Sequence, residues 1–220
     1  MESYHHKIVS MRNKKHYLLV GIITFVGLFL SIYVYVMMPR GEPLQLSPIQ
    51  YKNLSAIVED GDIILRLGDR IWSQFFRDVS VTDRRFSHMG IIRVVNDKIT
   101  VVHAEGDIGG GIDFVNEIPL KEFIEVARTI GIYRSNTIDG NLISSLALEY
   151  LGVPFDWQFD MTDDSKIYCT ELLYIILKRL APEIKLDTIF VNILQREIIP
   201  LEAISNSEYF YEILFIGTSE

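Results

Sequence analysis

Residues 86–106 read FSHMGIIRVVNDKITVVHAEG, and the prediction of the fold starts from this stretch. Two runs rich in apolar and branched residues, HMGIIRVV (88–95) and KITVVHA (98–104), are separated only by Asn96 and Asp97. Such runs around a two-residue polar turn predict an antiparallel β-hairpin. His88 opens the first strand and His103 ends the second, so the hairpin brings both imidazoles to one edge of a sheet.

The only cysteine lies in a second informative stretch, IYCTELLY (167–174). The pattern from about residue 165 to 181 predicts a helix, which an acidic or hydroxyl side chain at 163–165 can cap. Cys169 falls in the first turns of this helix. Unsatisfied N–H groups and the helix dipole favour an anion there, so we expect the thiolate of Cys169 to be favoured over the thiol.

A cysteine nucleophile needs a nearby base, usually histidine, and the base needs a third polar group that fixes its ring. After residue 38 the chain has only two histidines, His88 and His103. The residues alone leave three alternatives open: a Cys169/His88/His103 catalytic group, a structural cysteine, or a zinc ion held by the same three side chains. We expect no metal and no other cofactor.

The other patterns define the fold class. Strands are expected at residues 63–67, 130–134 and 209–217, and helices at 69–79 and from Asp139 to Gly152. Helices together with mostly hairpin-linked strands predict an α+β fold, in which an antiparallel sheet packs against helices.

A segment of 22 residues without a charge, 17–38, precedes these elements. At about 1.5 Å per residue it reaches across a hydrocarbon core of about 30 Å. Residues 1–16 carry a net charge of +3 and are expected to remain as a cytoplasmic tail. Because the apolar run is long and no small-x-small site follows it, we expect an uncleaved anchor; a signal peptide cut near Gly41 is the alternative.

Residues 39–58 contain three prolines and are expected to form a linker, and residues 59–220 to form the main folded domain. The chain beyond residue 16 carries a net charge of −11, which argues against nucleic acid as a partner. The expected partner is the lipid bilayer, through the N-terminal helix. The domain is expected outside the cytoplasm, which is the periplasm if the cell is Gram-negative.

Five short segments follow one another along the chain: GDIIL (61–65), FSHMGII (86–92), VVHAEG (101–106), PFDWQFD (154–160) and IYCTELLY (167–174). In this order the chain resembles the YiiX/YaeF-type circularly permuted papain-like hydrolases, a branch of the NlpC-like cysteine peptidase superfamily. The resemblance covers about residues 59–180. It implies a permuted papain-like fold, preceded here by one transmembrane helix.

The resemblance also implies roles for individual residues. Cys169 corresponds to the nucleophile and His88 to the general base, and His103 stands where many relatives have a glutamate as the third polar group. Glu105, two residues further on, is the reserve candidate for that third role. The side chains expected to line the substrate pocket are Tyr168, Asp156, Trp157, Phe159 and Glu171.

From these residues the sequence predicts a membrane-anchored thiol hydrolase that forms a cysteine acyl-enzyme, an amidase, peptidase or esterase. Cell-wall peptide amides are the expected substrate. Two alternatives remain at this point: a lipid-directed acyltransferase or lipase of the same fold, and a binding domain without catalytic activity.

Overall fold

The computed structural model describes residues 2–106 and 111–217, and the chain divides into two compact units, Met1–Pro39 and Arg40–Glu220. The first unit is one helix, α1 (Glu2–Met37). Its segment His16–Met37 has a mean hydropathy of 2.4 and none of it is buried, so by length and composition it can cross a membrane.

The second unit is built on a six-stranded sheet with the order β4-β3-β2-β1-β5-β8, in which every neighbouring pair is antiparallel. The strands are β1 (Ile63–Gly68), β2 (His88–Val95), β3 (Lys98–Glu105), β4 (Phe114–Pro119), β5 (Ala127–Ser135) and β8 (Phe210–Ile216). A separate hairpin pairs β6 (Ile189–Val191) with β7 (Arg196–Ile198). The expected antiparallel α+β fold is confirmed.

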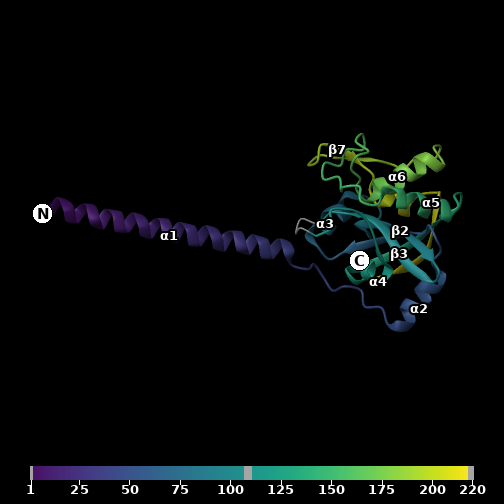
Figure 1. Cartoon of the computed structure of the whole chain (residues 1–220), viewed down its shortest axis with the longest axis horizontal. Coiled ribbons are helices and arrows are strands. Elements are labelled where there is room, and N and C mark those ends of the chain that lie inside the picture. Colours follow the sequence, from purple (N-terminus) through teal and green to yellow (C-terminus); the bar gives the residue numbers. More distant parts are fainter. Residues whose placement is uncertain (1, 107–110, 218–220) are drawn as a thin grey trace. The chain divides into compact units, whose positions relative to one another are not determined.

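Helices cover both faces of the sheet (Figure 1). On one face, α5 (Gly140–Ala147) and α6 (Cys169–Leu180) bury a large apolar cluster that includes Ile63, Met89 and Leu172. On the other face, α2 (Pro48–Ile57) and α4 (Leu120–Glu125) contribute to a second cluster around Ile64. All six residues of β1 are buried, because both of its faces are covered. The shorter elements are α3 (Ile71–Val79), the 3₁₀ turn Leu148–Tyr150 and α7 (Glu202–Ser205).

The hairpin predicted between residues 88 and 104 is present, with Ile91 opposite Val102 and Val95 opposite Lys98. Asn96 and Asp97 both have positive φ, 49° and 62°, as a two-residue type I′ turn requires. Both residue types tolerate the left-handed conformation, so the turn forms without the usual glycine.

Two boundaries differ from the sequence prediction. Part of the expected linker, residues 48–57, is the helix α2, which Ser47 caps and whose Leu54 is buried in the domain. Pro48 occupies the first helical position, where its missing N–H costs nothing. The helix α6 starts at Cys169 rather than near residue 165, because Asp163 accepts the N–H of Ser165 in a local turn instead.

Candidate active site

The candidate site lies at one end of the sheet strands, where β1 and β3 end and β2 begins. Arg66 of β1 is opposite His88 in the register, and the register of β2 with β3 carries His103 and Glu105 to the same edge. The predicted meeting of the two histidines is therefore observed.

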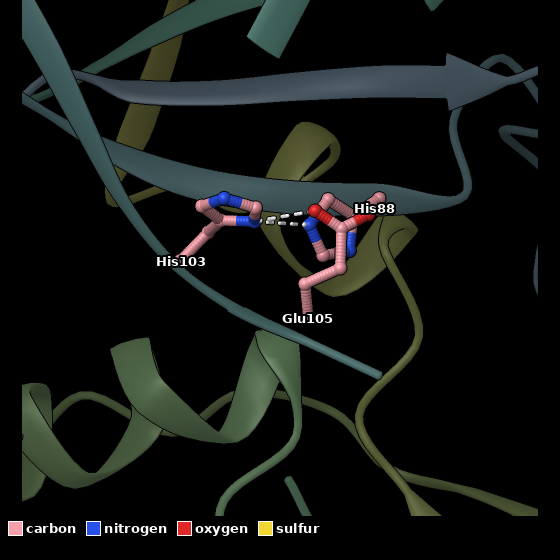
Figure 2. A group of neighbouring side chains, drawn as sticks. All are labelled: His88, His103 and Glu105. Carbon is pink, nitrogen blue, oxygen red and sulfur yellow. Dashed lines mark hydrogen bonds and ion pairs between the residues drawn. The ribbon is translucent and has the colours of Figure 1, made fainter. Parts of the chain in front are cut away.

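The two imidazoles are in direct contact. His88 Nε2 and His103 Nδ1 lie 3.0 Å apart, and Glu105 Oε2 lies 3.4 Å from the same His103 nitrogen. Figure 2 shows both interactions converging on that nitrogen. In the tautomer in which the Nε2–H of His88 donates to His103 Nδ1, the Nδ1 of His88 is left to accept a proton from another group. His103 is fully buried, and its Nε2 has no hydrogen-bond partner within residues 2–106 and 111–217.

An arginine that the sequence prediction missed completes this cluster. Arg66 is 4% exposed, and its guanidinium donates to Glu105 Oε1 at 2.7 Å and to the carbonyl of Phe123 at 3.0 Å. The ring of Phe123 lies 4.2 Å below this guanidinium and stacks on His88 at a centroid distance of 5.7 Å. A charged residue inside the apolar run IILRL was the signal in the sequence that could have identified Arg66.

Burial and the nearby Arg66 charge lower the pKa of both histidines well below the ordinary value of 6.5. Burial is the larger cause for each, and a proton on His103 would lower the pKa of His88 further. Both imidazoles are therefore neutral at neutral pH, which leaves His88 able to act as a base.

Cys169 is the first residue of α6 and is partly exposed. The backbone N–H groups of Met89 and Thr170 donate to its sulfur and, with the Arg66 charge, favour the thiolate. Burial outweighs them and raises the pKa of Cys169 to about 11. The expected preference for thiolate is thus reversed in the free protein: the helix terminus acts in the predicted direction, but loss of hydration is the stronger effect.

The sulfur of Cys169 contacts the start of β2, at the residue that follows His88. Met89 and Ile91 point toward the face covered by α6, so the alternation along the strand puts His88 on the opposite face, beside Phe123. Within the described parts of the chain no hydrogen bond joins Cys169 Sγ to either imidazole; its contact with β2 is the N–H of Met89. In ligand-free enzymes such catalytic hydrogen bonds are often long and tighten with substrate.

The profile of the permuted papain-like amidase family YaeF/YiiX, family C92, matches residues 57–204. The chain belongs to this family. The match includes the sheet strands β1 to β5, helix α6 and all of the residues of the candidate site.

Two comparisons with individual proteins agree with this membership. The uncharacterized protein YiiX of Escherichia coli K12 is 29% identical over 123 residues, which are 53% of this chain and 55% of YiiX. The match thus spans about half the length of that relative. A crystal structure described as metalloprotein YiiX from Escherichia coli O157:H7 has the same fold, with a TM-score of 0.59 at 17% identity, covering 73% of this chain and 98% of the other.

Of the five side chains expected to line a substrate pocket, only Trp157 is exposed, at 43%. Its indole N–H donates to Asp113 at 2.7 Å. Phe159 is buried and contacts the rings of Phe76, Phe155 and Tyr168. The structure therefore leaves Trp157 as the predicted side chain best placed to meet a ligand.

The other three have structural partners. Asp156 is buried and accepts the N–H groups of Gln158 and Asp160, which holds the loop in a turn. The hydroxyl of Tyr168 accepts the N–H of Ile199. Glu171 is 1% exposed and accepts the N–H of Tyr168, so it caps the start of α6 rather than being a solvated acid. Burial raises the pKa of Glu171 to about 8.

Proposed function

We propose that the protein is a membrane-anchored cysteine amidase in which Cys169 is the nucleophile and His88 the general base. The observation that carries the proposal is the buried chain of contacts Arg66–Glu105–His103–His88 at the sheet edge, next to a cysteine that opens a helix. A neutral imidazole with one nitrogen bonded and the other available is the base that thiol acylation requires, and Cys169, whose sulfur accepts the N–H of Met89 directly after His88, is proposed to reach it when substrate binds.

The proposed reaction has two halves. The sulfur of Cys169 bonds to the substrate carbonyl carbon while His88 Nδ1 takes the thiol proton. The backbone N–H of Cys169, which no helical carbonyl accepts at the first position, stabilises the developing oxyanion. The C–N bond then breaks, and His88 returns its proton to the leaving amine. Water hydrolyses the thioester with His88 again as base, which releases the acid and restores the thiol.

The pKa values of Cys169 and His88 indicate when the thiol proton is transferred relative to the attack on the carbonyl. The pKa of Cys169 is raised to about 11 and that of His88 lies well below 6.5, so both groups are neutral before substrate binds. Proton transfer is therefore proposed to accompany the attack rather than to precede it as a stable ion pair. His103 and Glu105 are positioning residues: they orient the His88 ring and stabilise the imidazolium that forms during the reaction.

The leading substrate class is an amide of cell-wall peptide, and acyl transfer from or to a lipid is the alternative. Both begin with the same acyl-enzyme and differ in the group that resolves it. In either case α1 holds the domain at the outer side of the cytoplasmic membrane, with residues 1–16 inside.

Activity-based labelling tests the proposal, since the chain contains a single cysteine and any thiol label reports on Cys169 alone. The full chain in detergent is incubated with panels of small amides and esters, and turnover is measured beside the Cys169→Ala variant. His88→Gln should lose turnover, whereas His16→Gln, a change outside the domain, should keep it. Full turnover in Cys169→Ala would refute the proposal.

A metal-dependent activity is the second candidate, because one ligand atom each from His88, His103 and Glu105 lies within 4.8 Å of the others. Two imidazoles and a carboxylate are a common zinc donor set, and the structure described as metalloprotein YiiX shares this fold. The donors fit a cation, which would act there as a Lewis acid. Arg66, bonded to Glu105, opposes it electrostatically. Metal analysis of purified wild type and of His103→Ala separates the two candidates.

A further inference from the structure

The base that the proposed mechanism needs depends on the tautomer of His103. His103 Nδ1 lies 3.0 Å from His88 Nε2, and a single proton lies between two neutral imidazole nitrogens at this distance. If the proton belongs to His88 Nε2, the Nδ1 of His88 has a free lone pair and can act as a base. If it belongs to His103 Nδ1, His88 carries its own proton on Nδ1 and the base is lost.

The tautomer with an available base requires an acceptor on the other side of His103. A neutral His103 without a proton on Nδ1 carries it on Nε2, and this atom is buried. Glu105 favours the opposite tautomer, since its Oε2 lies 3.4 Å from Nδ1 and a carboxylate only accepts. A buried N–H that finds no acceptor is unfavourable, so a second group has to bind the Nε2–H if His88 is to be the base.

Asn116 of β4 lies opposite His103 in the sheet register. Val115 exchanges backbone hydrogen bonds with Gly152 and Val153 on the side away from β3, so the N–H and C=O of Asn116 point toward β3. Asn116 and His103 therefore form a hydrogen-bonded pair of the antiparallel ladder. In such a pair the Cα atoms are about 5.5 Å apart and the two side chains lie on the same face of the sheet.

Both members of this pair have polar atoms without a hydrogen bond. Val115 belongs to the cluster under α6, so the alternation along β4 puts Asn116 on the opposite face, where His103 contacts the ring of Phe123. Asn116 is 8% exposed, and within residues 2–106 and 111–217 neither its amide oxygen nor its amide nitrogen has a partner. The same holds for His103 Nε2. Because buried amides are nearly always hydrogen-bonded, two such groups at paired positions are suited to each other.

We propose that Asn116 is a positioning residue whose amide oxygen accepts the Nε2–H of His103, after rotation of the amide or through one bridging water, and that it thereby keeps His88 a base. With its proton on Nε2, His103 accepts the Nε2–H of His88 on Nδ1. The Nδ1 of His88 then remains available for the thiol proton of Cys169. The inference rests on the proposed role of His88 as general base and adds the group that selects its tautomer.

Nitrogen-15 NMR of the histidine rings tests the proposal without any need for activity. The full chain in micelles carries His5→Gln, His6→Gln and His16→Gln, which leaves His88 and His103 as its only histidines. Two-bond proton–nitrogen correlations identify the protonated nitrogen of each ring. We expect both rings to be protonated on Nε2. The opposite tautomer pair has both protons on Nδ1, so the result does not depend on which signal belongs to which ring.

Variants of Asn116 connect the tautomer to turnover. Asn116→Leu removes the acceptor and should move both protons to Nδ1 and lower kcat about tenfold or more at nearly unchanged KM. Asn116→Asp keeps an acceptor oxygen and should keep both the wild-type tautomers and most of kcat. The matched control is Asn136→Leu, the same change at an exposed asparagine, which should alter neither.

Two results would overturn the inference: rings protonated on Nδ1 in the parent protein, or unchanged tautomers in Asn116→Leu. If Asn116→Leu does not fold, the parent protein and Asn116→Asp still decide, because Nδ1 protonation in either contradicts the role of Asn116. Absence of turnover in a parent protein whose two rings are protonated on Nε2 would count against the amidase alone.

Discussion

Replacing Arg66 by methionine should destabilise the protein more than any exposed arginine replacement, because it leaves Glu105 without its cation. The guanidinium is 5% exposed and lies 2.7 Å from the carboxylate. Removing one partner of a buried ion pair costs about 3–5 kcal/mol. Glu105 is 35% exposed, so water screens its half of the pair, and we expect about 2–3 kcal/mol for Arg66→Met.

A double-mutant cycle separates this ion pair from the packing of the long side chain. Arg66→Met/Glu105→Gln buries no unpaired charge and should recover about 1–2 kcal/mol relative to Arg66→Met alone. The control cycle uses Arg179 and Glu149, which are 2.7 Å apart but 46% and 55% exposed, and should show a coupling below about 0.5 kcal/mol. Urea unfolding of the full chain in micelles, followed by near-ultraviolet circular dichroism, gives the free energies. Additive effects at Arg66 and Glu105 would refute the reasoning.

Three further changes have defined outcomes. His103→Ala should lower kcat severalfold or more at unchanged urea midpoint, and if Glu105→Gln is the more damaging variant in the same assay, Glu105 rather than His103 is the main orienter. Burial raises the pKa of Glu171 from 4.5 to about 8, so the stability that its protonated carboxyl contributes is complete below pH 4.5 and is lost as the pH rises from 4.5 through 8; the stability difference from Glu171→Gln should change over the same pH range, and a pH-independent difference would contradict it. Asp97→Gly relieves a φ of 62° and should stabilise the hairpin by about 0.5–1 kcal/mol in thermal unfolding, whereas destabilisation would mean that the aspartate side chain contributes to the turn.

The parts of the fold that depend on neighbouring residues could be predicted from the sequence. The hairpin follows from branched residues on both sides of Asn96 and Asp97, so its register and the meeting of His88 with His103 were accessible. The start of α6 was not, because residue 167 pairs with residue 155 in a bridge that no local pattern reveals. The helix α2 was not predicted, because the three prolines of residues 39–58 indicated a linker, whereas Pro48 occupies the first turn of a helix that Ser47 caps.

The candidate site shows the same division. Residue types and order identified Cys169, His88, His103 and Glu105, whereas Arg66 and its contact with Phe123 depend on packing between β1 and α4. The pKa of Cys169 was predicted in the wrong direction, because a helix terminus can be read from a sequence and the loss of hydration around a sulfur cannot.

The most direct test of the central claim is the mass of the intact protein after reaction with an activated amide or ester, measured as a function of pH. The account predicts one acyl group on Cys169. It also predicts that the rate of acylation rises with pH in the range below 6.5, as His88 loses its proton. Around neutral pH the rate should be constant, because the pKa of the thiol is near 11. His88→Gln should abolish the acylation. An acyl group on another residue, or an undiminished rate in His88→Gln, would contradict the account.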